Sequence, residues 1–274
     1  LQSQGLKVFS NPTGSNFTRG IVSSLLGAVD NNGKLHADIA VLELDEAHAV
    51  HFVNDVNPNF SLLLNVMRDQ LDRFGEIDTT ARMLETVAKN TTEAVVLNRE
   101  DPRVAAIAKK LDKQTTHYFG LSSDAKSHFP NDDELHQKKV AKQNKAQNKD
   151  AVVLESFKNS SAVFSYLGKK KKVTLKLDGI YNVFNAAAAL ALVQAVVKNK
   201  VNEGSLFSAL KRVTPAFGRG EIIEVDGKPL ELVLVKNPAG FRLGLKSFSP
   251  KGYATMIAIN DNYADGRDMS WLWD

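Results

Sequence analysis

Three carboxylates follow a short apolar stretch near the beginning of the chain. Residues 39–42 are all apolar and too few for a helix, and Glu43, Asp45 and Glu46 come next. This pattern predicts a buried parallel strand, and open α/β sheets bind their ligands at the carboxyl ends of their strands. Carboxylates at that edge can bind magnesium, which combines a few acidic ligands with phosphate oxygens. They can also be ordinary helix-starting residues that complement the helix dipole.

A second apolar stretch ends in a similar way. Residues 60–66 predict another strand, and the turn and helix start behind it contain Arg68, Asp69, Asp72 and Arg73. Two strand ends that carry acids and arginines indicate a site for magnesium and a phosphorylated ligand. A regular helix start remains the alternative here as well.

Other candidate residues lie in loops. The loop NPTGSNFTRGI at 11–21 places Thr13 and Asn16 before an apolar helix, where they can bind a ligand or cap that helix. Arg219 lies between two glycines, whose missing side chains let a ligand approach its guanidinium group. A predicted strand at 255–259 is followed by three aspartates, Asp261, Asp265 and Asp268.

A sheet is needed to bring these residues together. Predicted strands at 94–98 and 117–121 alternate with helical segments at 79–90 and 102–111. This alternation predicts an α/β fold with a mostly parallel sheet and right-handed crossovers. The Asp101–Pro102 pair is a regular helix start, with aspartate as the cap and proline at the first position, so structure alone explains it.

A polar segment at 122–150 interrupts the alternation. It is rich in Lys, Gln, Asn and Asp, which predicts an exposed insertion or a lone polar helix. Short antiparallel strands are expected at 152–157, 162–167 and 173–177, and the four lysines at 169–172 are expected to form a solvated hairpin turn.

The strongest helix signal lies at 179–197. This segment is rich in alanine and apolar on more than one face, and Asn182 and Asn185 stand near its start. Asn182 can cap the helix or bind a ligand.

The chain is expected to contain two units. Residues 1–220 form the first, including the polar insertion, and residues 221–274 begin a second α/β domain with strands at 232–235 and 255–259.

Composition excludes several function classes. The 35 Lys and Arg against 31 Asp and Glu give a net charge of +4, concentrated in two lysine-rich stretches rather than on a nucleic-acid-binding face. The chain has no cysteine, which excludes disulfides, a thiolate nucleophile and a cysteine zinc site, and fits a cytosolic setting. No apolar stretch approaches the roughly 20 residues of a membrane span, so no integral membrane segment is expected.

Several motifs together resemble the Mur ligase superfamily. The last of them is the most specific and is typical of the branch that works with a glutamine amidotransferase subunit. Outside the resemblance lie about residues 122–165. The motifs are LELDEA at 42–47, LLLNVMRDQLDRFGE at 62–76, GIYNVFNAAAAL at 179–190, FGRGE at 217–221, KNPAG at 236–240 and NDNYADGRDMSWLWD at 260–274.

The resemblance implies a fold and a nucleotide site. The fold would be a Mur ligase central, ATP-binding domain over 1–220 and the start of a C-terminal Rossmann-like domain. ATP and Mg²⁺ would be the cofactors, with Glu46 binding the metal. Asn182 would reach the adenine, Arg219 would contact the nucleotide, and Thr13 and Asn16 would lie near nucleotide and substrate.

The same resemblance assigns the phosphate and substrate side to Arg68, Asp69 and Arg73. Gln70 stands where many Mur ligases have histidine, which puts a second metal site in doubt. The zinc ribbon of many relatives is excluded, because the chain has no cysteine.

One superfamily motif is missing. The phosphate-binding loop G-x-x-G-K-[ST] precedes the matched region in relatives but does not occur in these 274 residues. We therefore expect a sequence truncated at both ends. The alternative is a degenerate homologue without ATP chemistry.

The resemblance also implies an activity. A carbon–nitrogen ligase would amidate the α-carboxyl group of D-glutamate in the lipid II stem peptide to D-isoglutamine through an acyl phosphate, from the cytoplasm at the inner face of the membrane. Ammonia would come from a glutamine amidotransferase partner in a heterodimer, whose catalytic histidine Asp265, or else Asp261, would orient. The alternatives are another Mur-type amide ligase and a non-catalytic scaffold that docks a glutaminase.

Overall fold

The computed structural model of the chain describes most of its residues. Of Arg219 it describes the backbone only. The described residues are 1–11, 16–67, 77–131, 133–134, 151–158, 160–176, 179–214, 219–235, 241, 244–245 and 251–258.

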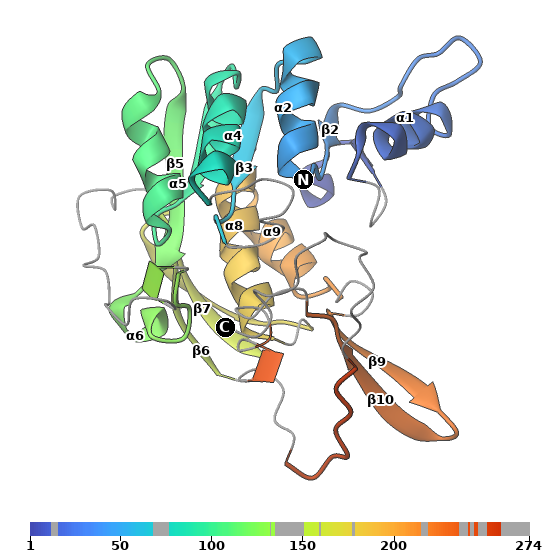
Figure 1. Cartoon of the computed structure of the whole chain (residues 1–274), viewed down its shortest axis with the longest axis vertical. Coiled ribbons are helices and arrows are strands. Elements are labelled where there is room, and N and C mark those ends of the chain that lie inside the picture. Colours follow the sequence, from blue (N-terminus) through green and yellow to red (C-terminus); the bar gives the residue numbers. More distant parts are fainter. Residues whose placement is uncertain are drawn as a thin grey trace.

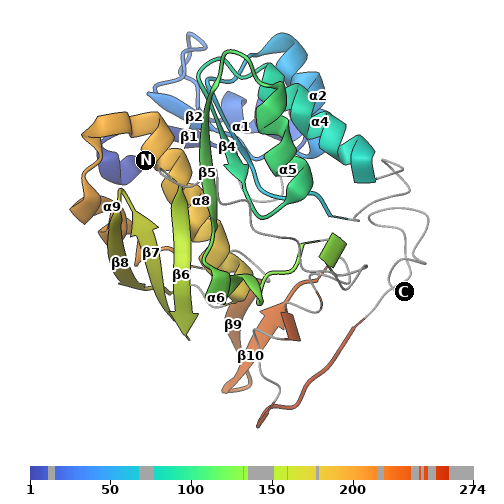
Figure 2. The same cartoon turned by 90° about the vertical axis from the view of Figure 1, so that its left-hand side faces the viewer.

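A six-stranded sheet with the order β3-β4-β5-β6-β7-β8 forms the centre of the fold (Figure 2). The strands β3 to β6 are parallel, and β7 and β8 extend the sheet by antiparallel pairing. This arrangement confirms the predicted α/β class with a mostly parallel sheet. The strands are β3 (Phe60–Leu63), β4 (Ala94–Asn98), β5 (Thr115–Leu121), β6 (Val152–Lys158), β7 (Ser161–Tyr166) and β8 (Lys169–Thr174).

Helices cover both faces of the parallel strands (Figures 1 and 2). Every residue of β4 is buried, because Val96 belongs to the core cluster on one face and Val95 and Leu97 to the cluster on the other. A strand covered on both faces must be apolar throughout, which is why its sequence shows no alternation. The first face carries α8 (Ile180–Val197) and α9 (Glu203–Leu210); the second carries α4 (Ile77–Lys89) and α5 (Pro102–Ile107), which continues as η2 (Ala108–Lys110).

The segment Ile180–Lys200, formed by α8 and η4 (Lys198–Lys200), is long and apolar enough to cross a membrane by length and composition alone. The expectation that no apolar stretch approaches this length was therefore wrong. The helix lies along the sheet, and Ala187, Leu190 and Ala191 on it are buried in the core. Its apolar character is accounted for by this packing, since a core helix passes the same compositional test.

The N-terminal part forms a separate pair of parallel strands, β1 (Val8–Ser10) and β2 (Ile39–Val41). Its other elements are η1 (Gln2–Gln4), α1 (Thr18–Leu26) and α2 (Glu46–Asp55). We predicted a buried strand at residues 39–42, but Ala40 is exposed and its neighbours are only half-buried. Among the described residues β2 pairs only with β1, so it is not one of the inner strands of the six-stranded sheet.

The prediction of an exposed insertion beginning at residue 122 is wrong in part, because Ala125, Lys126 and Phe129 are buried while residues 123, 124, 127 and 128 are exposed. Ser122 caps the short helix α6 (Ser123–Lys126) by accepting from the Ala125 amide at 3.1 Å. Phe129 is only 7% exposed and packs into the main core. A single aromatic ring thus anchors a segment whose composition is otherwise polar, while residues 135–150 lie outside the described residues.

The hairpin between β7 and β8 turns at Leu167 and Gly168, not at the lysines. Both residues have positive φ, 48° and 74°, as a two-residue type I′ turn requires. Residues 169–172 are therefore strand residues, and Lys169 pairs with Tyr166 directly across the turn. The predicted turn was wrong because four consecutive lysines are typical of a solvated turn, whereas here they form the first part of β8.

The last described elements are the antiparallel strands β9 (Arg219–Val225) and β10 (Lys228–Val233). The strand predicted at 232–235 thus begins earlier and ends at Val233. Of the strand predicted at 255–259, residues 255–258 are described and are not in a strand, and Met256 is 88% exposed. No described strand pairs with them, so no backbone ladder supports a strand there.

Candidate active site

The three acids after β2 occupy different environments. Asp45 is buried and caps α2, because its Oδ1 accepts from the amides of Ala47 at 3.2 Å and His48 at 3.5 Å. Glu46 is the first residue of α2 and is half-buried, whereas Glu43 is exposed at the strand end. The helix start uses Asp45, so Glu43 and Glu46 are the carboxylates of this strand end suited to a ligand.

The residues around the 11–16 loop hold this strand end in place. The Asn11 side-chain amide donates to the Glu43 carbonyl and accepts from the Glu43 amide, both at 2.9 Å. The carbonyl of Asn16 accepts from the Asp45 amide at 3.1 Å. The structure therefore brings Asn16 beside the residue that precedes Glu46, so these two predicted site residues come together.

Glu43 and Glu46 fit a magnesium site only if other ligands complete the shell of the ion. Among the residues that the structure describes, no group of three or more His, Cys, Asp or Glu side chains is placed to hold a metal ion. Magnesium at a nucleotide site needs only one or two carboxylates, because phosphate oxygens and water complete its shell. Glu43 and Glu46 fit such a shared site and not an all-protein metal cage.

Asn182 is the third residue of α8, and its backbone amide donates to the carbonyl of Gly179 at 3.2 Å. The helix cap is Gly179, so the alternative that Asn182 caps the helix does not hold. One turn into the helix, the ring of Phe184 lies 5.2 Å from that of Phe119, near the end of β5. The start of α8 therefore lies at the carboxyl edge of the sheet, where ligands bind in this fold class.

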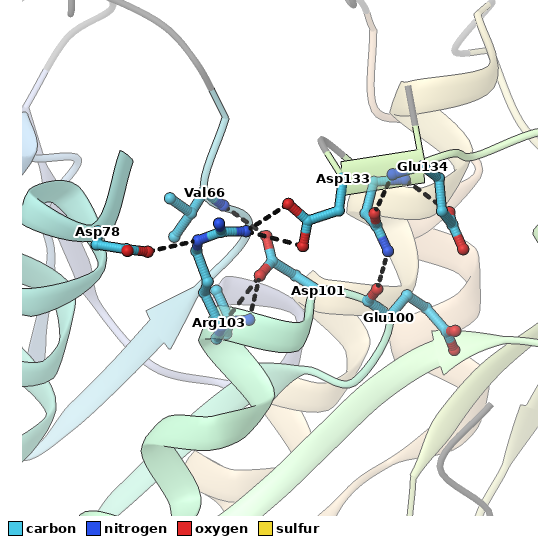
Figure 3. Close-up of polar contacts among 9 residues, drawn as sticks. Val66, Asp78, Glu100, Asp101, Arg103, Asp133 and Glu134 are labelled. Carbon is cyan, nitrogen blue, oxygen red and sulfur yellow. Dashed lines mark hydrogen bonds and ion pairs between the residues drawn. The ribbon is translucent and has the colours of Figure 1, made fainter. Parts of the chain in front are cut away.

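A polar network at the same edge joins the ends of β3 and β4 to residues 131–134 (Figure 3). Asp101 caps α5 through Oδ1, and its Oδ2 accepts from the Val66 amide at 2.6 Å. Burial raises the pKa of Asp101, although the three amide hydrogen bonds oppose that shift. Arg103 contacts two further acids, Asp78 at 2.9 Å and Asp133 at 3.0 Å.

The other half of the network is buried beneath this edge. Arg99 pairs with Glu100 at 2.8 Å and donates to the Leu121 carbonyl, so it spans from β4 to β5. Lys126 lies 3.4 Å from both Glu100 and Glu134, and the side chains of these three residues are at most 10% exposed. Buried charges require such pairing, because desolvation of a lone ion costs several kcal/mol.

Several predicted site residues lie outside the described residues, so their roles stay predictions. For Arg219 the structure gives only its position, the first residue of β9. No local sequence pattern indicates the contact of Asp101 with Val66 or that of Lys126 with Glu100, because the partners are far apart in the sequence. The predicted residues outside the described ranges are Thr13, Arg68, Asp69, Arg73, Asp261 and Asp265.

Comparison with protein families identifies the class to which this fold and strand-edge site belong. The Mur ligase middle domain matches residues 15–193. The chain therefore belongs to the Mur ligase family, which confirms the resemblance inferred from the motifs.

Two further comparisons show which branch of the Mur ligase family this chain is similar to. The MurT ligase C-terminal family matches residues 234–274. The subunit MurT of lipid II isoglutaminyl synthase (glutamine-hydrolyzing) from Streptococcus pneumoniae is 30% identical over 98% of this chain. The chain spans 64% of the length of that relative.

Solved structures show the same fold at low sequence identity. A pseudomurein peptide ligase type C from Methanothermus fervidus superposes with a TM-score of 0.68 and 20% identity, covering 92% of this chain and 53% of its own. MurF ligase from Thermotoga maritima in complex with ADP gives a TM-score of 0.64 and 19% identity, covering 90% and 52%. These similarities establish the fold and carry no residue roles.

Proposed function

We propose that the protein is the ligase subunit of an ATP-dependent amidating enzyme that converts the α-carboxyl group of D-glutamate in the lipid II stem peptide to an amide. The observation that carries this proposal is the MurT C-terminal match on a chain whose middle domain is a Mur ligase. A glutamine amidotransferase would form the partner subunit and supply ammonia. The enzyme would work in the cytoplasm, at the inner face of the membrane.

The chemistry would proceed in two steps. The substrate carboxylate attacks the γ-phosphorus of ATP, which releases ADP and forms an acyl phosphate. Ammonia then attacks the acyl carbon, inorganic phosphate leaves, and one proton is lost from nitrogen to give the amide. The ADP-bound relative from Thermotoga maritima supports the use of ATP.

The residues of this chain would bind and orient the reactants. Magnesium, when bound, would supply positive charge to the phosphate oxygens. Glu46, with Glu43 beside it, would hold that ion at the strand end, and the capped start of α2 would keep both carboxylates in place. Asn182 and Arg219 would bind the nucleotide, and Arg68, Asp69 and Arg73 would orient the phosphate and the substrate.

The proposal is tested with the intact protein and its glutaminase partner. ATP, Mg²⁺ and lipid II are supplied with either glutamine or ammonium, and ADP release and amidated lipid II are measured together. The proposal predicts one ADP for each amide formed. ADP release with a free amino acid as acceptor, and none with ammonium, would instead identify another Mur-type amide ligase.

The metal assignment has its own test. Glu46→Gln should lower turnover by about 10²- to 10³-fold, since the phosphate charge would lose its compensation. The start of α2 should keep its cap, because Asp45 and not Glu46 forms it. Glu43→Gln tests the second carboxylate of the same strand end separately. Near-normal turnover of Glu46→Gln at saturating magnesium would exclude Glu46 as the ligand.

A further inference from the structure

Asp101 uses its two carboxylate oxygens for two different tasks. Oδ1 accepts from the amides of Arg103 at 2.9 Å and Val104 at 3.0 Å, which caps α5. Oδ2 accepts from the Val66 amide at 2.6 Å, across a separation of 35 residues in the sequence. A serine would serve as the cap alone. The cap alone does not require a carboxylate, whereas the cap and the contact with Val66 together do.

The partner of Oδ2 lies at the exit of β3. Val66 follows the last strand residue, Leu63, and its side chain is buried in the core. Two residues later the sequence reaches Arg68, the first of the residues that the proposed function places on the phosphate side. The Val66 amide is thus held two residues before the segment to which the proposed function assigns the phosphate side.

Arg103 contacts the other side of the same connection. Its Nε lies 2.9 Å from Asp78, in the first turn of α4, and its Nη1 lies 3.0 Å from both oxygens of Asp133 (Figure 3). The start of α5 thus holds described residues on both sides of segment 68–76. Burial decides which contact matters more: the Asp78 side chain is 71% exposed, whereas the bond between Asp101 and Val66 is buried.

We propose that Asp101 is a positioning residue for the phosphate side of the site: it fixes the exit of β3 through the Val66 amide and does not itself contact the ligand. The inference rests on the proposed ATP-dependent function. Arg103 has a secondary role at the start of α4. The cap on α5 is a separate task that another side chain is able to perform.

The test separates the two tasks of Asp101. Asp101→Ser keeps a cap but is too short to reach Val66, and Asp101→Asn has one carbonyl oxygen for two groups of amide donors. In the intact protein with its partner, both variants should raise the KM for ATP about tenfold in the ammonia-driven reaction. In both, the Val66 amide should exchange its hydrogen faster than in the wild type.

The matched control is Asn202→Ala, which removes the cap of α9, where Asn202 accepts from the Ser205 amide at 3.1 Å. It should lower the melting temperature and leave both the KM for ATP and the exchange of Val66 unchanged. A purely structural role for Asp101 predicts that its variants behave like this control, and that result would overturn the proposal.

The exchange measurement also distinguishes the proposal from the function on which it rests. If the Val66 amide exchanges as slowly in Asp101→Ser as in the wild type, Asp101 does not fix the exit of β3, whatever reaction the protein catalyses. Faster exchange in the variant would support the role of Asp101 at the exit of β3. If the wild-type protein then neither binds nor hydrolyses ATP, only the proposed function is refuted.

Discussion

At the residue scale, the packing at the carboxyl ends of β4 and β5 depends on the close contact between Arg99 and Gly120. The Arg99 side chain crosses β5 directly over Gly120, and a Cβ added at Gly120 would lie 2.0 Å from Arg99 Nε. Arg99 is buried and paired with Glu100, so it cannot move aside without breaking that pair. Glycine in a strand often marks such an approach, but the sequence does not reveal which side chain occupies the space.

Gly120→Ala should therefore destabilise the protein by about 1–3 kcal/mol, the usual cost of overpacking a core. Chemical denaturation measures this change. Gly204→Ala in α9 is the control, because its added Cβ would meet no atom closer than 3.5 Å. Equal stability of Gly120→Ala and the wild type would mean that Arg99 has another place to go.

The candidate residues illustrate how far sequence reasoning reaches at this scale. The cap formed by Asp101 was predicted and is confirmed, since a cap joins residues two or three positions apart. The bond of Asp101 with Val66 and the pairing of Lys126 with Glu100 join residues of different elements, and no local pattern encodes them. The roles assigned to Glu46, Asn182 and Arg219 remain predictions that depend on a bound nucleotide.

At the element scale, strands and helices between residues 77 and 121 were predicted closely, because each has a complete local signal. The signal fails where one side chain decides the structure. Phe129 draws a polar segment into the core, and the turn at Leu167 and Gly168 makes a strand of four lysines. For β2, the neighbour that would bury it cannot be read from its own sequence.

Lys126→Met should cost about 1–3 kcal/mol of stability, because it removes the cation that the buried carboxylates of Glu100 and Glu134 share, whereas Arg99 still pairs with Glu100. Denaturant unfolding provides the measurement. The exposed Lys109 supplies the control, and Lys109→Met should change stability by less than about 0.5 kcal/mol. Similar unfolding midpoints for the two variants would show that the Lys126 pairs contribute nothing.

Glu85 connects α4 to η2 and should give a pH-dependent contribution. Its hydrogen bond with Lys110 at 2.5 Å, and then that with Lys89 at 2.7 Å, lower the pKa of Glu85 below 4.5. A lowered folded-state pKa means that the stabilisation is present above pH 4.5 and is lost as pH falls through the lowered pKa.

Glu85→Gln should thus be less stable than the wild type at pH 7, by about 1 kcal/mol or less. The difference should disappear in acid. Unfolding midpoints between pH 7 and pH 3 measure it, with Glu93→Gln, an exposed glutamate paired with one lysine, as the comparison. A constant difference over this range would contradict the ion-pair explanation.

At the scale of the whole molecule, the proposed function assigns glutamine hydrolysis to a partner and the ligase reaction to this chain. The C-terminal motif adds aspartates beside Trp271 and Trp273, and tryptophan is enriched at the centres of protein interfaces. The proposed function already assigns the acids of the ligase reaction to the strand edges, at Glu46 and Glu43. The division into residues 1–220 and 221–274 remains a prediction, and we place the partner interface on the second part.

Asp265→Asn should reduce amidation driven by glutamine far more than amidation driven by added ammonium, because only glutamine hydrolysis needs the partner's oriented histidine. Both rates are measured on the intact protein together with the glutaminase partner that the proposed function assigns to it. Asp268→Asn, in the same motif, is the control and should affect neither reaction. Equal loss with both nitrogen donors would reject the role of Asp265 and would indicate a structural one.

The lysines of β8 bear on how separate copies of the protein behave in concentrated solution. β8 is the last strand of the six-stranded sheet, so one of its edges is the natural template for a strand from another copy. Two such edges brought together would bring the lysines at 169–172 of both copies close to one another; Lys170 and Lys171 have carboxylate partners, but like charges among the remaining lysines oppose pairing. Salt weakens this barrier, since the screening length falls to about 3 Å at 1 M. A row of charge that sequence reasoning placed in a turn thus acts as a safeguard against aggregation, and concentrated salt is the condition in which that safeguard is weakest.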